Sequence, residues 1–343
     1  MVIREKQHPY VFAGVTDVTD CKTSREVLIK SNLDWDVKTG YLYGEANNIK
    51  FENKNSFLDN GKQYIKCDEH YCTYRTDTNQ ILGVVKGKYT PVQNRDAFDF
   101  FDNIIIKGDS EWFTAGCYNN GRKVFITAKI NKTFKIANAN DDVDNYLIFI
   151  TSHDGSTGVK VLLTPIRVVC FNMLNAAINS STKYFSFKHT ESVHYNIEKV
   201  QDVFKSIIYK IDIVKEYYQK LYNTKITDEV AADIICSAVL NESEYNQIKL
   251  VNSKPMQLAL GNYVYGLDVS TQKRRLIGDI FEYYNIGIGQ KEIIGTGWGL
   301  YNAISGYYSN VDNADGIRRM DNFIDGRFST KIKEVGELIA DVA

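Results

Sequence analysis

The pattern of apolar and polar positions divides the chain into a β-rich first part and a helical second part. In the first 80 residues, segments such as 63–67 and 71–75 are rich in aromatic and β-branched residues and are separated by Asn, Asp and Gly. This composition is typical of short strands and turns. Beyond residue 190, apolar residues recur at helical spacing and predict one long amphipathic helix from Val193 to Tyr222.

The middle of the chain is predicted to form a helix, four strands and a second helix. Asn94 is a candidate N-cap for a helix that continues to Ile106, and Asn119-Asn120-Gly121 is a strong signal for a β-hairpin turn. The strands are expected at Glu111–Tyr118, Lys123–Ile130, Tyr146–Thr151 and Val159–Leu163, and the second helix at Val168–Ile178.

Further helices are expected in the last part of the chain. The pattern Thr227-Asp228-Glu229 predicts a helix N-terminus. The expected helices are Thr227–Leu240, Thr271–Asn285, Trp298–Tyr308 and Ile317–Ile339. The fold class is therefore α+β, with N-terminal and central antiparallel β-sheet and packed helices, followed by a mostly α-helical C-terminal half. We expect a β-rich segment over residues 1–80, an α+β core over 81–190 and a helical region over 191–343.

Composition narrows the class of protein. With 44% hydrophobic and 24% charged residues, the chain is typical of a globular protein. The first residues lack the apolar run of a signal peptide, and no window approaches a membrane span. We therefore expect a cytosolic protein that makes no use of a membrane. The six cysteines are scattered, which favours reduced and mostly buried thiols over disulfides.

The charge is distributed unevenly, although the net charge is only −1. Residues 83–190 carry 13 Lys and Arg against 9 Asp and Glu, so this is the one net-positive third of the chain. Alternation along the strand Lys123–Ile130 places Lys123, Phe125 and Lys129 on one face. Such a face is either an ordinary solvated sheet surface or a groove for a phosphodiester backbone.

The second interpretation predicts a nucleic-acid site made of cations and one aromatic ring. Cations would contact phosphates, and Phe125 would stack on a base. The candidate residues are Arg122, Lys123, Phe125, Lys129, Lys160 and Arg167, with Lys86 and Lys88 as second choices.

Signals for other chemistry are weak. Cys67, His70 and Cys72 do not have the spacing of a standard zinc site, and no cofactor motif is present, so we expect neither a metal nor a cofactor. His153, Asp154 and Cys170 could form a nucleophile with its base. However, His153-Asp154-Gly155-Ser156 is more simply a turn in which Asp154 bonds its own backbone.

Four segments resemble a known family. They are GVVKGKYTPVQNRDAFDFFD (83–102), TSHDGSTGVKVLLTPIRVVCFNMLNAAI (151–178), KHTESV (188–193) and GTGWGLYNAISGYY (295–308). Together they resemble the phage/plasmid-like protein family, a domain of unknown function, over residues of about 80 to 310. The resemblance implies an origin in phages, prophages or plasmids, and it supplies no catalytic residues.

Three hypotheses follow. The leading one is a phage-encoded protein without enzymatic activity that binds single-stranded nucleic acid and forms a homo-oligomer. Its finer form is an annealing protein in phage recombination or replication. This step is an analogy with the cores of ring-forming single-strand annealing proteins. The alternative is an interaction protein that antagonises a host defence or sequesters a nucleotide, with a phage or host protein as partner. A Cys/His enzyme is the third.

Overall fold

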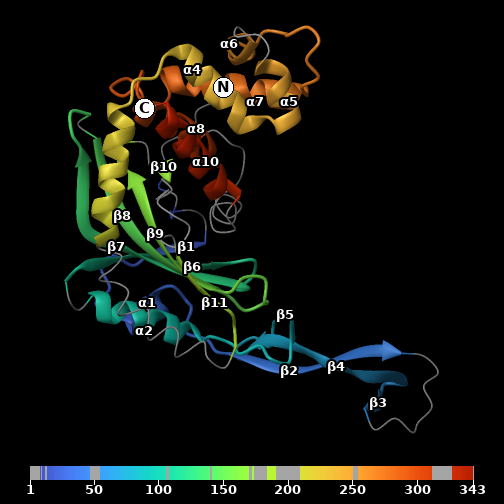
Figure 1. Ribbon diagram of the computed structural model, residues 1–343. Helices are drawn as coiled ribbons and strands as arrows, with labels where there is room; N and C mark the ends of the chain where they lie inside the picture. Colours follow the sequence, from blue (N-terminus) through green and yellow to red (C-terminus); the bar gives the residue numbers. More distant parts are fainter. Residues whose placement is uncertain are drawn as a thin grey trace.

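The computed structural model describes residues 8, 10–11, 14–46, 55–105, 108–139, 141–169, 172–173, 184–190, 209–249, 254–310 and 327–342. Within these residues the chain forms a central antiparallel sheet, a second sheet that projects from it, and a group of helices at the opposite end (Figure 1). Antiparallel sheets thus occupy the N-terminal and central parts, and most helices lie in the C-terminal half. The predicted fold class is confirmed.

The central sheet is a meander of long strands. Its main strands are β6 (Ser110–Tyr118), β7 (Lys123–Ile136), β8 (Asp141–Ser152) and β9 (Val159–Arg167). The short strand β1 (Val15–Asp17) pairs with β6, while β10 (Asn172–Met173) and β11 (Tyr184–Phe187) both pair with β9. Asn119, Asn120 and Gly121 all have positive φ, which is the backbone that the β6–β7 hairpin turn requires.

Two sequence predictions in this part of the chain are corrected. Asn172 and Met173 form β10, so the helix predicted over Val168–Ile178 is wrong there; residues 170–171 and 174–178 lie outside the described residues. Helix α2 (Asn94–Ile105) forms as expected, but Asn94 does not cap it. The Asn94 amide donates to the Leu33 carbonyl instead, at 2.9 Å, so this side chain links distant segments.

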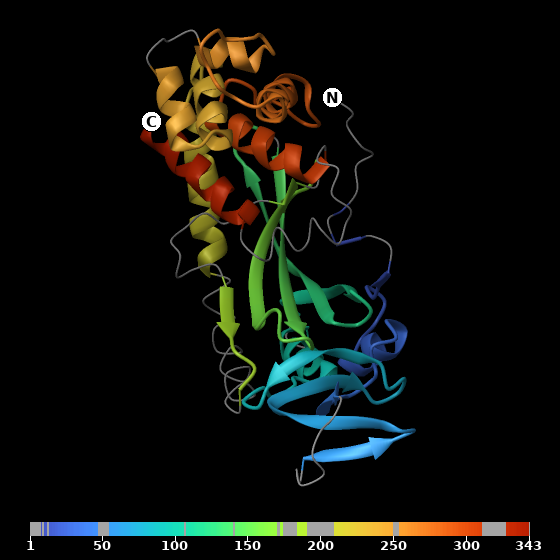
Figure 2. The ribbon, with the colours of Figure 1, turned by 90° about the vertical axis from the view of Figure 1, so that its right-hand side faces the viewer.

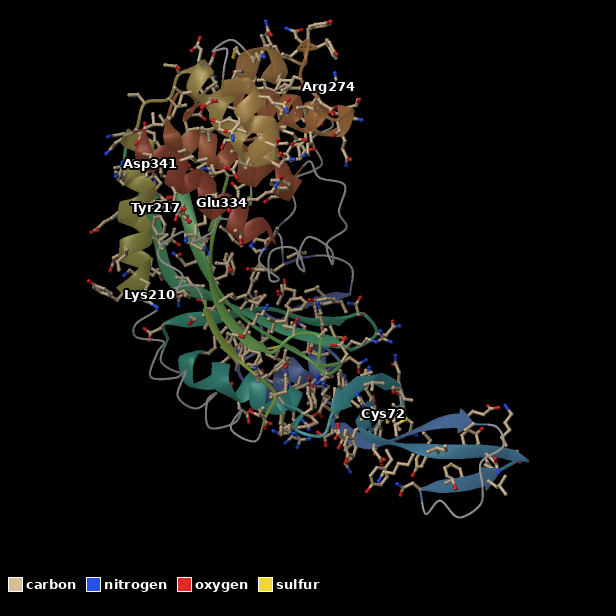
Figure 3. The ribbon with its side chains drawn as sticks, turned by 45° about the vertical axis from the view of Figure 1, so that its right-hand side comes forward. Cys72, Lys210, Tyr217, Arg274, Glu334 and Asp341 are labelled. Atoms are coloured by element: carbon tan, nitrogen blue, oxygen red, sulfur yellow. The ribbon has the colours of Figure 1, made fainter. Side chains whose placement is uncertain are left out.

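The second sheet, which we call the arm, contains β2 (Val37–Ala46), β3 (Ser56–Asp59), β4 (Lys62–Arg75) and β5 (Ile81–Lys86). Strand β4 pairs with all of the others. The two short strands expected at 63–67 and 71–75 are therefore one long strand, interrupted by an irregularity. Figures 1 and 2 show the arm extending away from the central sheet, and Cys72 lies near its base in Figure 3.

Helices α1 (Ser24–Lys30) and α2 pack on one another beside the central sheet. The C-terminal half contains a helix over residues 209–223, and further helices follow it. These are α4 (Asp228–Val239), α5 (Glu242–Lys249), α6 (Lys254–Ala259), α7 (Thr271–Ile286), α8 (Gly297–Asn310) and α10 (Arg327–Asp341). Thr227 caps α4 by accepting the N–H of Val230, as the sequence predicts. Among the described helices, none combines the length and the apolar character needed to cross a membrane.

One hydrophobic core joins the central sheet to the helical half. The Phe134 ring of β7 lies 6.2 Å from the Tyr218 ring, and the Gln219 side chain accepts the N–H of Ala137 at 2.8 Å. Tyr217 on the same helix points toward α10 in Figure 3, and its hydroxyl occupies the space that a side chain at Gly336 would need. Buried contacts therefore cross the boundary predicted at residue 190.

Candidate functional site

The face of β7 that was expected to meet nucleic acid is buried. Alternation does place Lys123, Phe125 and Thr127 on one face, but Phe125 is 0% exposed and Lys123 only 7%. The Phe125 ring belongs to a second hydrophobic cluster on this side of the sheet. That cluster consists of Tyr10, Tyr118, Phe125, Tyr146, Ile148, Ile150, Leu162 and Ile166. The expectation that Phe125 presents its ring to a base is corrected by this burial.

Arg167 has a structural role instead of an exposed one. Its side chain is 2% exposed and donates from Nε to Asp141 Oδ2 at 2.6 Å and from an Nη atom to the Gly289 carbonyl at 2.7 Å. Trp298 Nε1 donates to the same Asp141 oxygen at 2.7 Å. Because a buried guanidinium with these partners is already neutralised, Arg167 joins the sheet to the helical half and offers no phosphate contact.

The remaining predicted cations differ in their surroundings. Lys129 forms an ion pair with Asp144, with 2.7 Å between Nζ and Oδ2, and Lys160 is half-buried between Ile150 and Ser186 of the neighbouring strands. Arg122 is exposed at the start of β7. Lys86 and Lys88, the second choices of the sequence prediction, are exposed beside a pocket.

This pocket, which we call the motif pocket, has a volume of about 380 Å³. Three of the four segments that carry the family resemblance meet there: the segment that starts at Gly83, the turn after β8, and the residues after β11. The pocket is lined by Val84, Val85, Lys86, Lys88, Tyr89, Asp154, Gly155, Thr157, Gly158, Lys188, His189 and Thr190.

Close backbone contact holds the turn after β8 against the arm. A Cβ atom at Gly83 would lie 2.5 Å from Asp154 Cα, so only glycine fits at this point of β5. Thr73 Oγ1 donates to the His153 carbonyl at 2.6 Å, and the Tyr89 hydroxyl donates to the Ser152 carbonyl at 2.8 Å. The base of the arm and the end of the central sheet therefore form one rigid wall of the motif pocket.

Tyr89 and His189 also line the motif pocket. Their rings stack with centroids 4.7 Å apart, and His189 bonds the Thr90 carbonyl and the Thr151 hydroxyl, each at 3.2 Å. Burial lowers the pKa of His189 and raises the pKa of Tyr89, so both side chains are neutral near pH 7. The charge of the motif pocket comes from other residues.

Lys86, Lys88 and Lys188 supply that charge. All three are exposed, and no described carboxylate lies within ion-pair distance of them. The Asp154 carboxylate, also at the pocket, accepts the N–H of Ser156 at 2.9 Å, as the sequence predicts for this turn. Three lysines against one carboxylate favour an anion such as a phosphate group.

His153 is buried beneath this turn. Asn94 donates from its amide nitrogen to Leu33, so its oxygen accepts from His153 Nε2, at 3.0 Å. The ring also packs edge-on against Trp35, and burial lowers the pKa of His153 to about 3. These contacts are those of a neutral structural histidine. Cys170, its expected partner in an enzyme, lies outside the described residues.

The described cysteines do not line the motif pocket, and the lining side chains that commonly bind metals are those of Asp154 and His189. Cys21, Cys67, Cys72, Cys117 and Cys236 are all free and are buried or half-buried. No group of three or more His, Cys, Asp or Glu side chains among the described residues could hold a metal ion.

Sequence reasoning missed Lys188 and Tyr89 as site residues. Both lie in segments that carried the family resemblance, so the convergence of those segments was the available signal. The count of charged residues could not reveal this convergence, because such a count gives every cation of the middle third the same weight.

Comparison with known proteins identifies the family. No curated protein and no solved structure matches the chain. A family model does match residues 81–331, which include the whole motif pocket and most of the helical half. The chain therefore belongs to the family described as Domain of unknown function (DUF932).

Proposed function

We propose that this protein binds single-stranded nucleic acid and that the motif pocket contacts the phosphate backbone. The observation that carries the proposal is the convergence of Lys86, Lys88 and Lys188 at a pocket whose walls are fixed by Gly83, Tyr89 and His189. Exposed ammonium groups on a rigid wall neutralise phosphates without reading sequence. A role in annealing during phage recombination or replication, as a homo-oligomer, is the finer form of this proposal.

A salt titration tests the proposal. Binding of a fluorescein-labelled oligothymidylate is measured by anisotropy at several salt concentrations. For single strands the logarithm of the affinity falls with the logarithm of salt by about 0.7 per neutralised phosphate. The triple variant Lys86→Glu/Lys88→Glu/Lys188→Glu should therefore bind more weakly and reduce the slope by about 2.

A matched variant separates local contacts from net charge. Lys215, Lys220 and Lys225 are exposed in the helical half, and changing all three to Glu alters the net charge equally. This control should bind within about two-fold of wild type at 0.15 M salt, where screening acts over about 8 Å. If both triple variants lose the same affinity, the motif pocket is not the contact.

Two further measurements address the alternatives. A free mononucleotide that displaces the oligothymidylate at equal concentration would favour nucleotide sequestration, for which the pocket volume of about 380 Å³ is sufficient. A protein that binds no single strand at micromolar concentration in low salt would overturn the proposal and favour a protein partner. Light scattering of the purified protein measures whether it assembles into the expected homo-oligomer.

A further inference from the structure

The arm exposes several large aromatic and aliphatic side chains. Tyr41 is 57% exposed, Tyr43 41% and Phe57 45%, although all three lie within strands. Single exposed apolar residues are common and need no explanation, whereas a contiguous group indicates a contact surface. The arrangement of these rings on the arm decides which case applies.

The rings form two contact groups along the arm. The Tyr43 ring meets the Phe57 ring edge-on with centroids 5.0 Å apart, and Phe57 stacks on Tyr64 at 5.2 Å with 19° between the ring planes. Nearer the base of the arm, the centroids of Tyr41 and Tyr71 are 6.0 Å apart. We call these five residues the aromatic face.

An irregularity in β4 brings both groups to the same side of the sheet. Tyr41 pairs with Tyr71, but Tyr43 pairs with Lys66. The chain therefore advances by five residues along β4 over the same distance in which it advances by two along β2. Glu69, within this bulge, has a φ of 63°. Such a bulge reverses the alternation of side chains, and Lys66 Nζ accordingly lies 3.5 Å from the centre of the Tyr41 ring.

The aromatic face is continuous with the motif pocket. Tyr71 pairs with Val85, a lining residue of the pocket, and a Cβ atom at Gly87 would lie 3.4 Å from the Tyr71 ring. Gly87 stands between Lys86 and Lys88 in the chain. A single strand of nucleic acid that leaves the motif pocket past Val85 and Gly87 would therefore meet the Tyr71 ring next.

Charge along the aromatic face favours a polyanion with flat, apolar groups. Lys66 supplies positive charge to the aromatic face, because its ammonium lies over the Tyr41 ring. Lys62, at the outer end of β4, is paired with the Glu45 carboxylate at 3.0 Å and adds no net charge. A cation beside rings suits a phosphate next to stacked bases, because every base offers a π-face whatever its sequence.

We propose that the aromatic face is the base-stacking surface for single-stranded nucleic acid and extends the phosphate contacts of the motif pocket along the arm. This inference rests on the proposed function and adds the surface that holds the bases: unpaired bases stack on these rings without sequence preference. A duplex keeps its bases stacked inside and cannot use these rings, so single strands are preferred.

The test is the triple variant Tyr43→Ala/Phe57→Ala/Tyr64→Ala in the full chain, titrated with labelled oligothymidylate over a range of salt concentrations. Loss of base stacking should weaken binding by about five-fold or more, since one stacked base contributes about 1–3 kcal/mol and about 1.4 kcal/mol is ten-fold. The salt slope should remain that of wild type, because no phosphate contact is lost.

Two control variants separate the loss of the rings from other effects of substitution. Tyr43→Phe/Phe57→Tyr/Tyr64→Phe retains all three rings and should bind like wild type. Leu58→Ala/Gln63→Ala changes a cross-strand pair on the opposite face of the same strands and should also bind like wild type. Circular dichroism with thermal melting shows whether each variant is folded.

The outcomes separate the two proposals. If wild type binds single strands but the ring-deleted variant binds equally well, the aromatic face is not the stacking surface, while the proposed function stands. If wild type binds no single strand, both fail. If the ring-deleted variant keeps its affinity but has a smaller mass by light scattering, the aromatic face is a contact with a second copy of the chain, which also overturns the inference.

Discussion

The central sheet and the arm both carry aromatic residues on strands whose side chains alternate between two faces. The two sheets nevertheless place such residues in opposite environments. Phe125 of β7 is 0% exposed, whereas Phe57 of β3 is 45% exposed. Both have lysines two to nine residues away in the chain. The difference arises because Tyr10, Tyr118 and Tyr146 share a cluster with Phe125, while the rings beside Phe57 are themselves partly exposed.

This comparison teaches what alternation along a strand can and cannot reveal. Alternation identifies which side chains share a face. It does not reveal whether that face is covered, because the covering residues come from distant parts of the chain. The surface that we favour for nucleic acid therefore lies on the arm and the motif pocket, and the covered face of β7 should matter for stability alone.

Arg167 should show the largest effect on stability. Arg167→Ala leaves the buried Asp141 carboxylate without its cation, and removing one partner of such a pair costs about 3–5 kcal/mol in free energy of unfolding. Urea denaturation measures the loss. Lys129→Ala breaks a partly exposed pair with Asp144 and should cost less than about 1 kcal/mol. Equal losses would mean that Arg167 does not join the two halves.

The two phenylalanines test the comparison directly. Phe125→Ala removes a buried ring and should lower the free energy of unfolding by about 3–5 kcal/mol. Phe57→Ala removes cross-strand ring contacts on an exposed face and should lower it by less than about 1 kcal/mol. Thermal or urea unfolding of both variants measures the difference. A large loss from Phe57→Ala would show that the aromatic face is part of a core.

Local signals in the sequence predicted local structure well. Asn119-Asn120-Gly121 specified a hairpin, and Thr227 specified the start of α4, because in both cases the determining contacts lie within a few residues. The helix predicted after Arg167 was wrong because a short apolar run fits a strand as well as a helix. Asn172 and Met173 form a strand because they pair with β9.

The site was less predictable because its contacts join residues that lie far apart in the chain. The partners of Arg167 are Asp141 and the carbonyl of Gly289, and the second of these lies 122 residues away. The irregularity in β4 that gathers the arm's rings on one face has no strong local signal, since Glu69 is an unusual residue at positive φ. Only the motif segments indicated where the pocket would form.

Gly83 should show an intermediate effect because it lies where the arm meets the central sheet. Gly83→Ala forces a Cβ atom against the backbone of Asp154, and such overpacking costs about 1–3 kcal/mol. The variant should also weaken binding of single strands, since it pushes apart the arm and the turn that together form the rigid wall of the motif pocket. Gly44→Ala on the arm, where a Cβ atom meets nothing within 4 Å, is the matched control. Equal behaviour of both variants would contradict a rigid junction.

The last expected effect is the pH dependence due to His153. Burial lowers the pKa of His153 from 6.5 to about 3, so below pH 6.5 the unfolded chain binds a proton that the folded protein does not. Stability must therefore fall as the pH falls from 6.5 toward 3, by about 1.4 kcal/mol from this residue at pH 5.5. His153→Gln keeps a donor for Asn94 and removes the titrating ring, so urea unfolding between pH 7.5 and 4.5 should show a shallower slope.

Other groups do not obscure this difference. Burial also lowers the pKa of His8, to about 4, and that of His189, but both remain in the variant and contribute equally to its slope. Gly83→Ala alters the junction above His153 without removing a titrating group and should keep the slope of wild type. An unchanged slope in His153→Gln would mean that the ring takes up its proton at the same pH in the folded and the unfolded chain. The turn that forms one wall of the motif pocket would then rest on a group that becomes charged below pH 6.5, and the lysines would not be the pocket's sole cations there.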